Sequence, residues 1–261
     1  HPGGAGHGHD APAPEVASAG DAPLLLALAE PDRPAAAPAR AITGITGQDK
    51  YRFRVLHTSR HLPEKAIKVL KKAHGGFAVD RRPGRGEVYF ALAGAGIIQI
   101  SADLASTRLI ETAPPVRDTN QHNTLIWHAP DGPSYLAFPA NEAGKVFTTT
   151  LDGKLVHTLD SPAPGDDLGS ETATKYFREK LKFVPTDVEQ LDGLYYIATG
   201  YSPLDYVLTA RLRLDPFDAA WNNLSFGGKG TEPGQFGTGH GITVPPGARR
   251  PDVADRPHSE I

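Results

Sequence analysis

Residues 184–214, VPTDVEQLDGLYYIATGYSPLDYVLTARLRL, contain the pattern that decides the fold. A polar turn is followed by a short apolar segment, an Asp-Gly turn, an aromatic segment and a third apolar segment. Asp-Gly between two apolar runs is typical of a β-hairpin, because both residues tolerate the positive φ of a tight hairpin turn. The stretch therefore predicts three consecutive strands.

The same pattern occurs three more times along the chain. The other segments are residues 73–101, 121–159 and 239–261. Aligned, the four segments place His74, His122, Thr186 and His240 at one position before the first strand, at intervals of 48, 64 and 54 residues. Such intervals are longer than those of a solenoid and fit the blades of a β-propeller with insertions. We therefore expect an all-β propeller, with a β-sandwich of similar hairpins as the alternative.

The composition favours the same fold class. Gly 28 and Pro 24 make up about a fifth of the 261 residues, which is typical of a turn-rich β protein. Two stretches predict helices, as small insertions on the β body: 63–73 and 171–182, the second with Ser170 as its N-cap.

The chain is expected to have two parts. Residues 1–46 are rich in Ala, Pro and Gly and predict a flexible tail, because they contain few groups that could form a core. Residues 47–261 predict the propeller, with four recognisable blades of which the last lacks its third strand. We expect either further blades, or a contribution from Tyr51–Leu56, whose alternating pattern predicts a half-buried strand.

Several function classes are disfavoured by the residue types. The net charge of −3 argues against a nucleic-acid partner, and no apolar run is long enough for a membrane span. The absence of cysteine excludes disulfides and thiolate metal sites. The chain begins at His1 and has no methionine, so we expect a secreted or periplasmic protein whose signal peptide has been removed.

Two adjacent segments resemble the NHL-repeat family of propeller blades. The last one, with its lead-in FGGKGTEPGQFGTGHGITVPPGARRPDVADRPHSEI, carries PGQF, GHGI and VADR, and the preceding one carries PTDV, an Asp-Gly turn and a Gly-Tyr pair. Together they are similar to the lyase half of the peptidylglycine-amidating system and to related bacterial six-bladed propellers. The resemblance covers 121–261, and more weakly 73–101.

That resemblance implies a set of site residues. In the lyase, three histidines from different blades bind zinc, with a tyrosine and arginines beside the metal. By position, His122 and His240 match metal ligands, Tyr201 matches the tyrosine, and Arg256 matches an arginine. The remaining histidine is implied in a later blade. The chain departs from the pattern at Gly239, where proline is typical.

A second departure concerns the first blade. The family's substrate-binding arginine has no clear match there. Three nearby arginines are unaligned with it: Arg81, Arg82 and Arg85.

The residues themselves point to the same chemistry. Neutral imidazole is a common zinc ligand, and a catalytic zinc keeps three protein ligands and one open position. Histidines at equivalent positions of different blades face one central axis, which makes His74, His122 and His240 a candidate metal group. The alternative for each is a histidine that is hydrogen-bonded in a turn.

Two further residues are candidates for catalysis. Tyr201 is expected to transfer a proton at the cavity, with a buried aromatic of the blade core as the alternative. Arg256 is expected to bind a substrate carboxylate, with an ion pair to Asp252 or Asp255 as the alternative. Asn120, Asn123 and Asp118 flank His122 and are candidates for hydrogen bonds that orient it.

Three functional hypotheses follow. The first is a zinc-dependent lyase that cleaves a C–N bond of a small-molecule or peptide substrate, releasing an amide and glyoxylate, with a structural calcium ion as a second candidate cofactor. The second is a non-catalytic propeller that binds a protein, peptide or glycan, since this fold carries many functions. The third is a structural periplasmic or surface protein tethered through its tail.

Overall fold

The computed structural model describes residues 44–130, 132–179 and 182–257, all within one unit of the chain, 36–261. Most of the expected tail lies outside these residues, so its flexibility stays a prediction. Ile45 and Thr46, at the end of that expected tail, pair within a strand.

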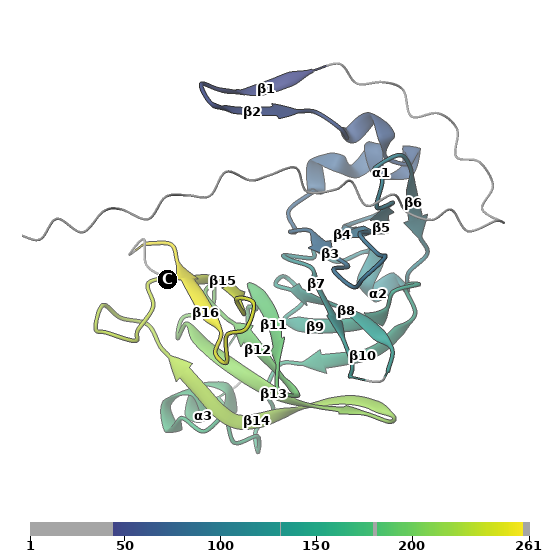
Figure 1. Cartoon of the computed structure of the whole chain (residues 1–261). Coiled ribbons are helices and arrows are strands. Elements are labelled where there is room, and N and C mark those ends of the chain that lie inside the picture. The colour runs from purple at the N-terminus through teal and green to yellow at the C-terminus, as the bar shows by residue number, and fades with distance from the viewer. Residues whose placement is uncertain (1–43, 131, 180–181, 258–261) are drawn as a thin grey trace, which may run out of the picture. The chain divides into compact units, whose positions relative to one another are not determined.

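Three four-stranded antiparallel sheets follow one another along the chain (Figure 1). The first contains β3 (Ala78–Val79), β4 (Val88–Leu92), β5 (Gly96–Ile100) and β6 (Thr107–Ile110). The second contains β7 (Leu125–His128), β8 (Ser134–Ala140), β9 (Lys145–Thr150) and β10 (Leu155–Asp160). The third contains β11 (Asp187–Leu191), β12 (Leu194–Ala198), β13 (Tyr206–Leu214) and β14 (Phe217–Gly227). A two-stranded sheet follows, with β15 (Gly239–Thr243) and β16 (Asp252–Asp255).

The first strands of successive sheets lie side by side. β3 contacts β7, β7 contacts β11, and β11 contacts β15, while in each sheet the strands pair in chain order. Sequential up-and-down sheets joined through their first strands are the blades of a propeller. The predicted all-β propeller is therefore confirmed, with three four-stranded blades and two strands of a fourth. Among the described residues the blades do not form a closed ring, and the number six stays a prediction.

The predicted hairpin turn in the third blade is present. Asp192 and Gly193 join β11 to β12 with φ of 49° and 77°, the positive values that a two-residue hairpin turn needs. The sequence pattern predicts three strands per blade, whereas each complete blade has a fourth, namely β6, β10 or β14. These outer strands are partly exposed, so their hydrophobic alternation is weak.

Helices occur where they were expected, as short insertions. α1 (Glu64–Val69) continues into a 3₁₀ turn, η2 (Leu70–Lys72), and α3 spans Glu171–Arg178. Ser170 caps α3, since its side chain accepts a hydrogen bond from the backbone N of Ala173 at 3.3 Å.

Two one-turn helices were not expected. They are η1 (Ser59–His61) and α2 (Pro114–Arg117).

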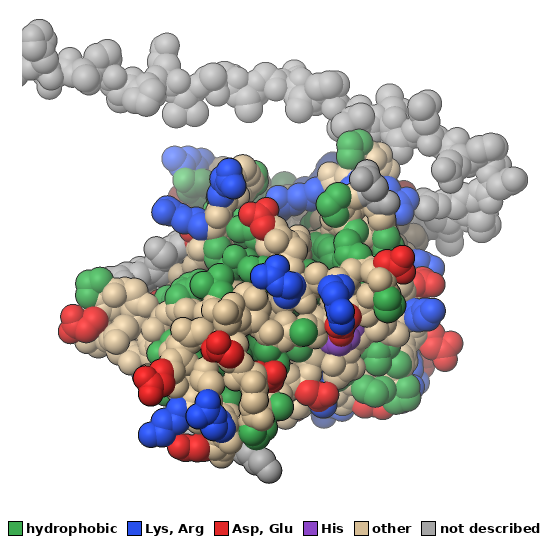
Figure 2. Space-filling view, turned by 90° about the horizontal axis from the view of Figure 1, so that it is seen from below, with side chains coloured by type: hydrophobic (Ala, Val, Ile, Leu, Met, Phe, Trp, Pro, Cys, Tyr) green, Lys and Arg blue, Asp and Glu red, His purple; other side chains and the backbone are tan. Residues whose placement is uncertain are grey.

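The surface carries charges of both signs. On the face shown in Figure 2, Lys and Arg side chains lie among Asp and Glu side chains. Within the described part of the chain, no helix has the length and apolar character needed to span a membrane.

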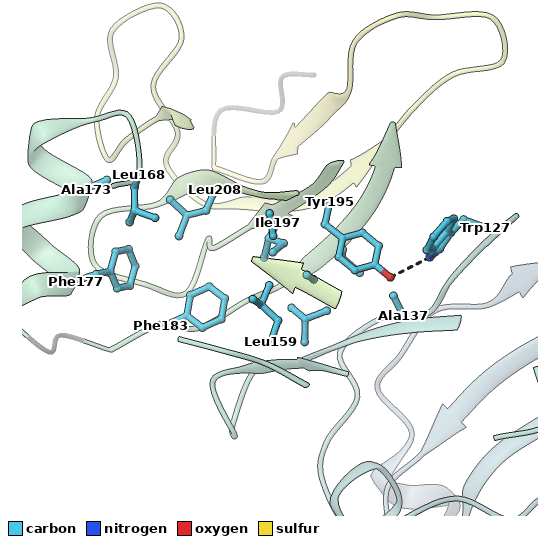
Figure 3. Close-up of a cluster of buried hydrophobic side chains, with 14 of the residues drawn as sticks. Trp127, Ala137, Leu159, Leu168, Ala173, Phe177, Phe183, Tyr195, Ile197 and Leu208 are labelled. Carbon is cyan, nitrogen blue, oxygen red and sulfur yellow. Dashed lines mark hydrogen bonds between the residues drawn. The ribbon is translucent and has the colours of Figure 1, made fainter. Parts of the chain in front are cut away.

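The largest buried cluster joins the second and third blades (Figure 3). Trp127 of β7 donates its Nε1 hydrogen to the hydroxyl of Tyr195 of β12 at 2.9 Å, and Thr148 of β9 bonds the same hydroxyl at 3.0 Å. Burial raises the pKa of Tyr195, so the phenol stays neutral and can serve both partners. Each fully buried aromatic of this kind stabilises the fold by about 1.5–3 kcal/mol.

A strand forms within Tyr51–Leu56 as expected, over Tyr51–Arg54, but the expectation that it is half-buried is wrong. Within the described part of the chain β2 (Tyr51–Arg54) pairs with β1 (Ile45–Gln48) alone, and Tyr51 and Phe53 are 62% and 61% exposed. Asp49, with φ of 51°, closes a two-residue turn between them. This local hairpin forms in place of a long-range pairing, so β2 completes no blade among the described residues.

Candidate functional site

The repeat positions identified in the sequence come together in the structure. His74 precedes β3, His122 precedes β7, and His240 is the second residue of β15. The ring centroids of His74 and His122 lie 4.5 Å apart, and those of His122 and His240 lie 4.8 Å apart. Thr186, the fourth repeat position, immediately precedes β11 and contacts His122 through its backbone oxygen. Residues from all four blades therefore meet at one place.

A cavity of about 230 Å³ lies at this meeting point. Its lining consists of the three histidines and their neighbours on the inner strands: His74, Gly76, His122, Asn123, Thr186, Asp187, His240 and Gly241. His74 is exposed, whereas His122 is only 4% exposed, so the lining combines a surface histidine with a buried one.

His122 has one nitrogen fixed and the other unpaired. Its Nδ1 lies 2.7 Å from the carbonyl oxygen of Thr186, which can only accept, so Nδ1 carries the hydrogen and Nε2 carries the lone pair. Nε2 is buried and has no hydrogen-bond partner among the residues that the structure describes. Burial lowers the pKa of His122 to about 4, against the hydrogen bond to Thr186, and the charges of His240, His74 and Arg256 lower it further. His122 is therefore neutral at pH 7, with a free acceptor in the cavity wall.

Tyr201 contacts the rings of His122 and His240, and Arg256 lies next to Tyr201. Tyr201, from the loop between β12 and β13, has its Oη 2.8 Å from His240 Nε2, and Arg256 Nη1 donates to the same Oη at 3.4 Å. A guanidinium only donates, so the phenol accepts from Arg256 and its own hydrogen is available for His240. Burial lowers the pKa of His240, and the charges of Arg256 and His74 add to this effect.

These contacts decide the alternative that the sequence left open for Tyr201. Tyr201 is 39% exposed and hydrogen-bonded to His240, so it is no core aromatic. Arg256 is exposed and directed at the phenol of Tyr201. The roles of His74, His122, His240, Tyr201 and Arg256 in binding or catalysis stay predictions.

The structure explains why glycine and not proline stands at position 239. Its N–H donates to both carboxylate oxygens of Asp205 at 3.1 Å, a bond that proline has no hydrogen to make. A side chain at the neighbouring Gly200 would also bring its Cβ within 2.3 Å of the Gly239 oxygen. Gly200 therefore permits the close approach that places Tyr201 against His240.

Two buried carboxylates support the site and were missed from the sequence. Asp187 is 4% exposed and Asp205 is 1% exposed. Burial raises the pKa of Asp187 to about 7, against hydrogen bonds from Ile242, Val188 and Asn123. A signal for Asp187 was present, because it directly follows the third repeat position, as Asn123 follows the second.

Other residues near His122 lie elsewhere. Asn120 donates to Asn141 at 2.9 Å, and Asp118 pairs with Arg117 at the surface. Of the three residues expected to orient His122, only Asn123 lines the cavity.

Two of the unaligned arginines of the first blade form ion pairs within that blade. Arg82 and Arg85 face the buried Asp80, at 2.7 Å and 3.6 Å.

The donor set of the cavity fits zinc better than calcium. It offers imidazole nitrogens, and the unpaired Nε2 of His122 is a lone pair without a proton. As they stand, no three His, Asp or Glu side chains of the described ranges are arranged to hold a metal ion. His240 Nε2 is bonded to Tyr201, so this ring would have to turn before Nε2 could bind a metal.

Comparisons with known proteins give similarity of fold only. No family model and no curated protein matches the chain. Solved structures that resemble it include a catalytically inactive virginiamycin B lyase from Staphylococcus aureus with quinupristin (16% identity, TM-score 0.40, 65% of this chain and 44% of that chain). A streptogramin B lyase matches at 11% identity and TM-score 0.42, over 70% of this chain and 54% of that chain. A proposed 6-phosphogluconolactonase from Bacteroides uniformis matches at 13% identity with a TM-score of 0.42, over 80% of this chain and 53% of that chain. The chain spans about half the length of these structures.

Proposed function

We propose that this chain is a zinc-dependent lyase, which cleaves the C–N bond of an α-hydroxyglycine-like substrate to release an amide and glyoxylate. The observation that carries the proposal is the Nε2 atom of His122. It is buried, unpaired and free of a proton, and it lies between two further imidazole rings in a cavity open to solvent. Leaving such an acceptor without a partner costs about 1–3 kcal/mol, a cost that a ligand would remove.

The proposed metal ligands are His74, His122 and His240. Zinc, when bound, supplies a Lewis acid that stabilises negative charge developing on a substrate oxygen. His122 is already held in the right tautomer by Thr186, whereas the rings of His74 and His240 are less buried and free of backbone bonds in the described structure. His240 gives up its bond to Tyr201 when it binds.

Tyr201 and Arg256 are the proposed groups for substrate binding and proton transfer. The Arg256 guanidinium is exposed beside the cavity and suits the carboxylate of the substrate. In the reaction, the substrate hydroxyl loses its proton as the aldehyde forms, the C–N bond breaks, and the nitrogen gains a proton. Tyr201 accepts a hydrogen bond from Arg256 and donates one to His240, which suits it to carry that proton.

Zinc content and glyoxylate release test the proposal together. The metal-loaded protein is analysed by mass spectrometry of its elements and then incubated with an N-acyl-α-hydroxyglycine. We expect one zinc per chain and glyoxylate production. His122→Ala should lose both, whereas Tyr201→Phe should keep the zinc and lower the rate about 100-fold or more. A wild-type chain that takes up no zinc would overturn the proposal.

The second candidate is a propeller that binds a ligand at the same cavity without catalysis. It is favoured by the present arrangement of the side chains, in which no three form a ready metal site within the described residues. It predicts that the chain neither takes up zinc nor releases glyoxylate, yet binds carboxylate-containing peptides in a manner that depends on Arg256.

A further inference from the structure

Two consecutive residues at the start of the third blade bond to both neighbouring blades. Thr186 and Asp187 lie between the loop that carries His122 and the strand that carries His240. Both are buried, at 0% and 4% exposure. Each of them makes one hydrogen bond toward the second blade and one toward the fourth.

Thr186 contacts a residue on each side. Its backbone oxygen accepts the Nδ1 hydrogen of His122 at 2.7 Å, and its Oγ1 donates to the backbone oxygen of Gly239 at 3.0 Å. Gly239 immediately precedes His240. One residue thus fixes the tautomer of the first imidazole and the backbone position of the second.

Asp187 repeats this arrangement one residue later. Its Oδ1 accepts from Asn123 Nδ2 at 2.6 Å, and its Oδ2 accepts from the backbone N of Ile242 at 2.9 Å. Asn123 immediately follows His122, and Ile242 lies two residues after His240. The four bonds therefore lie at or beside both candidate ligands. Two reach His122 and the residue after it, and two reach the backbone on either side of His240.

We propose that Thr186 and Asp187 are positioning residues that set the separation of His122 and His240 for metal binding. This inference rests on the proposed function. In the repeat, Thr186 occupies the position that holds a histidine in the other three blades. A short hydroxyl side chain there leaves the cavity open, where a fourth ring would fill the space, and it holds the backbone just before His240 through Gly239.

The test compares zinc affinity with stability in matched variants. Thr186→Val removes the hydroxyl and keeps the shape of the side chain, and Thr186→Ser restores the hydroxyl. Thr209→Val is the control, because Thr209 is also fully buried in the third blade and donates to a backbone oxygen, that of Leu224, outside the cavity lining. Zinc chloride binding is measured by calorimetry, and unfolding by urea.

We expect Thr186→Val to bind zinc at least tenfold more weakly than wild type, and Thr186→Ser to stay within about twofold. Thr209→Val should lose stability to a similar degree as Thr186→Val and keep its zinc affinity. Equal zinc affinity of wild type and Thr186→Val would overturn the positioning role. Should Thr186→Val fail to fold, Asp187→Asn is measured by the same criteria, since it weakens the second pair of bonds.

A metal-free measurement separates this inference from the proposed function. If the wild type binds no zinc, the proposed function fails, and the positioning is read from NMR of the imidazole nitrogens. Thr186→Val keeps the backbone oxygen that holds His122 but removes the hydroxyl that holds Gly239, so it should shift the ring signals of His240, whereas Thr209→Val should not. Unchanged His240 ring signals in Thr186→Val would overturn the positioning role independently of any metal.

Discussion

The phenol oxygen of Tyr201 lies 2.8 Å from Nε2 of His240, and it joins a loop of the third blade to the first strand of the fourth. The contact depends on a close approach of two backbones, because Gly200 packs against the carbonyl of Gly239. His240 in turn lies 4.8 Å, ring to ring, from His122 of the second blade. Small residues and buried hydrogen bonds between blades, rather than any single strand, therefore build the site.

Gly200→Ala should disrupt this approach. The added Cβ would lie 2.3 Å from the Gly239 oxygen, so one backbone must move. Overpacking of this kind costs about 1–3 kcal/mol. We expect that loss in urea unfolding, together with loss of the Tyr201–His240 contact in NMR spectra. Gly241→Ala is the matched control, since its Cβ would find ordinary contacts at 3.8 Å and 3.9 Å; equal destabilisation by both changes would contradict the explanation.

His122 should make the fold less stable in acid. Its pKa is about 4 in the folded protein, whereas an unfolded histidine has a pKa of about 6.5. Between these values the unfolded chain binds a proton that the folded chain does not, so stability falls as the pH drops from about 6.5 to 4. The loss is on the order of 3 kcal/mol. Urea unfolding of wild type and His122→Gln at several pH values measures it, and parallel profiles for the two proteins would refute it.

The titration of Asp187 should change the stability of the fold in the opposite direction to that of His122, over a similar pH range. Burial raises the pKa of Asp187 to about 7, so between about pH 4 and 7 the folded chain holds a proton that the unfolded chain releases. Stability from this group is greatest below about pH 4 and is lost as the pH rises toward 7. Asp187→Asn removes this dependence. Relative to wild type, the variant should gain on the order of 4 kcal/mol between pH 4 and 7, and a difference that does not change with pH would exclude the shift.

Tyr195→Phe should weaken the junction of the second and third blades. The change leaves Trp127 Nε1 and Thr148 Oγ1 without the hydroxyl that both contact in the buried cluster. An unsatisfied buried donor costs about 1–3 kcal/mol. Thermal and urea unfolding should show this loss, whereas Tyr196→Phe, at a partly exposed position of the same strand, should cost less than about 0.5 kcal/mol. A Tyr195→Phe protein as stable as wild type would show that the hydroxyl is dispensable.

The sequence alone determined the fold class and the place of the candidate site. The repeat places His74, His122, Thr186 and His240 at equivalent positions of their blades. Equivalent positions of blades arranged around one axis lie close together, so the spacing of the repeat was enough to predict this cluster. Local rules also located α3, because an N-cap serine and the residues it caps are neighbours in the chain.

Only the tertiary structure decided which residues support that cluster and which strands join the blades. Asp187 and Asp205 gain their importance from backbone N–H groups more than 30 residues away, at Ile242 and Gly239, and no local pattern encodes such partners. The aromatic alternation of Tyr51–Arg54 predicted burial, yet these residues pair only with a neighbouring strand and stay exposed. Periodicity specifies which side chains share a face, whereas burial depends on whether another part of the chain covers that face, and this is settled by packing across the whole fold.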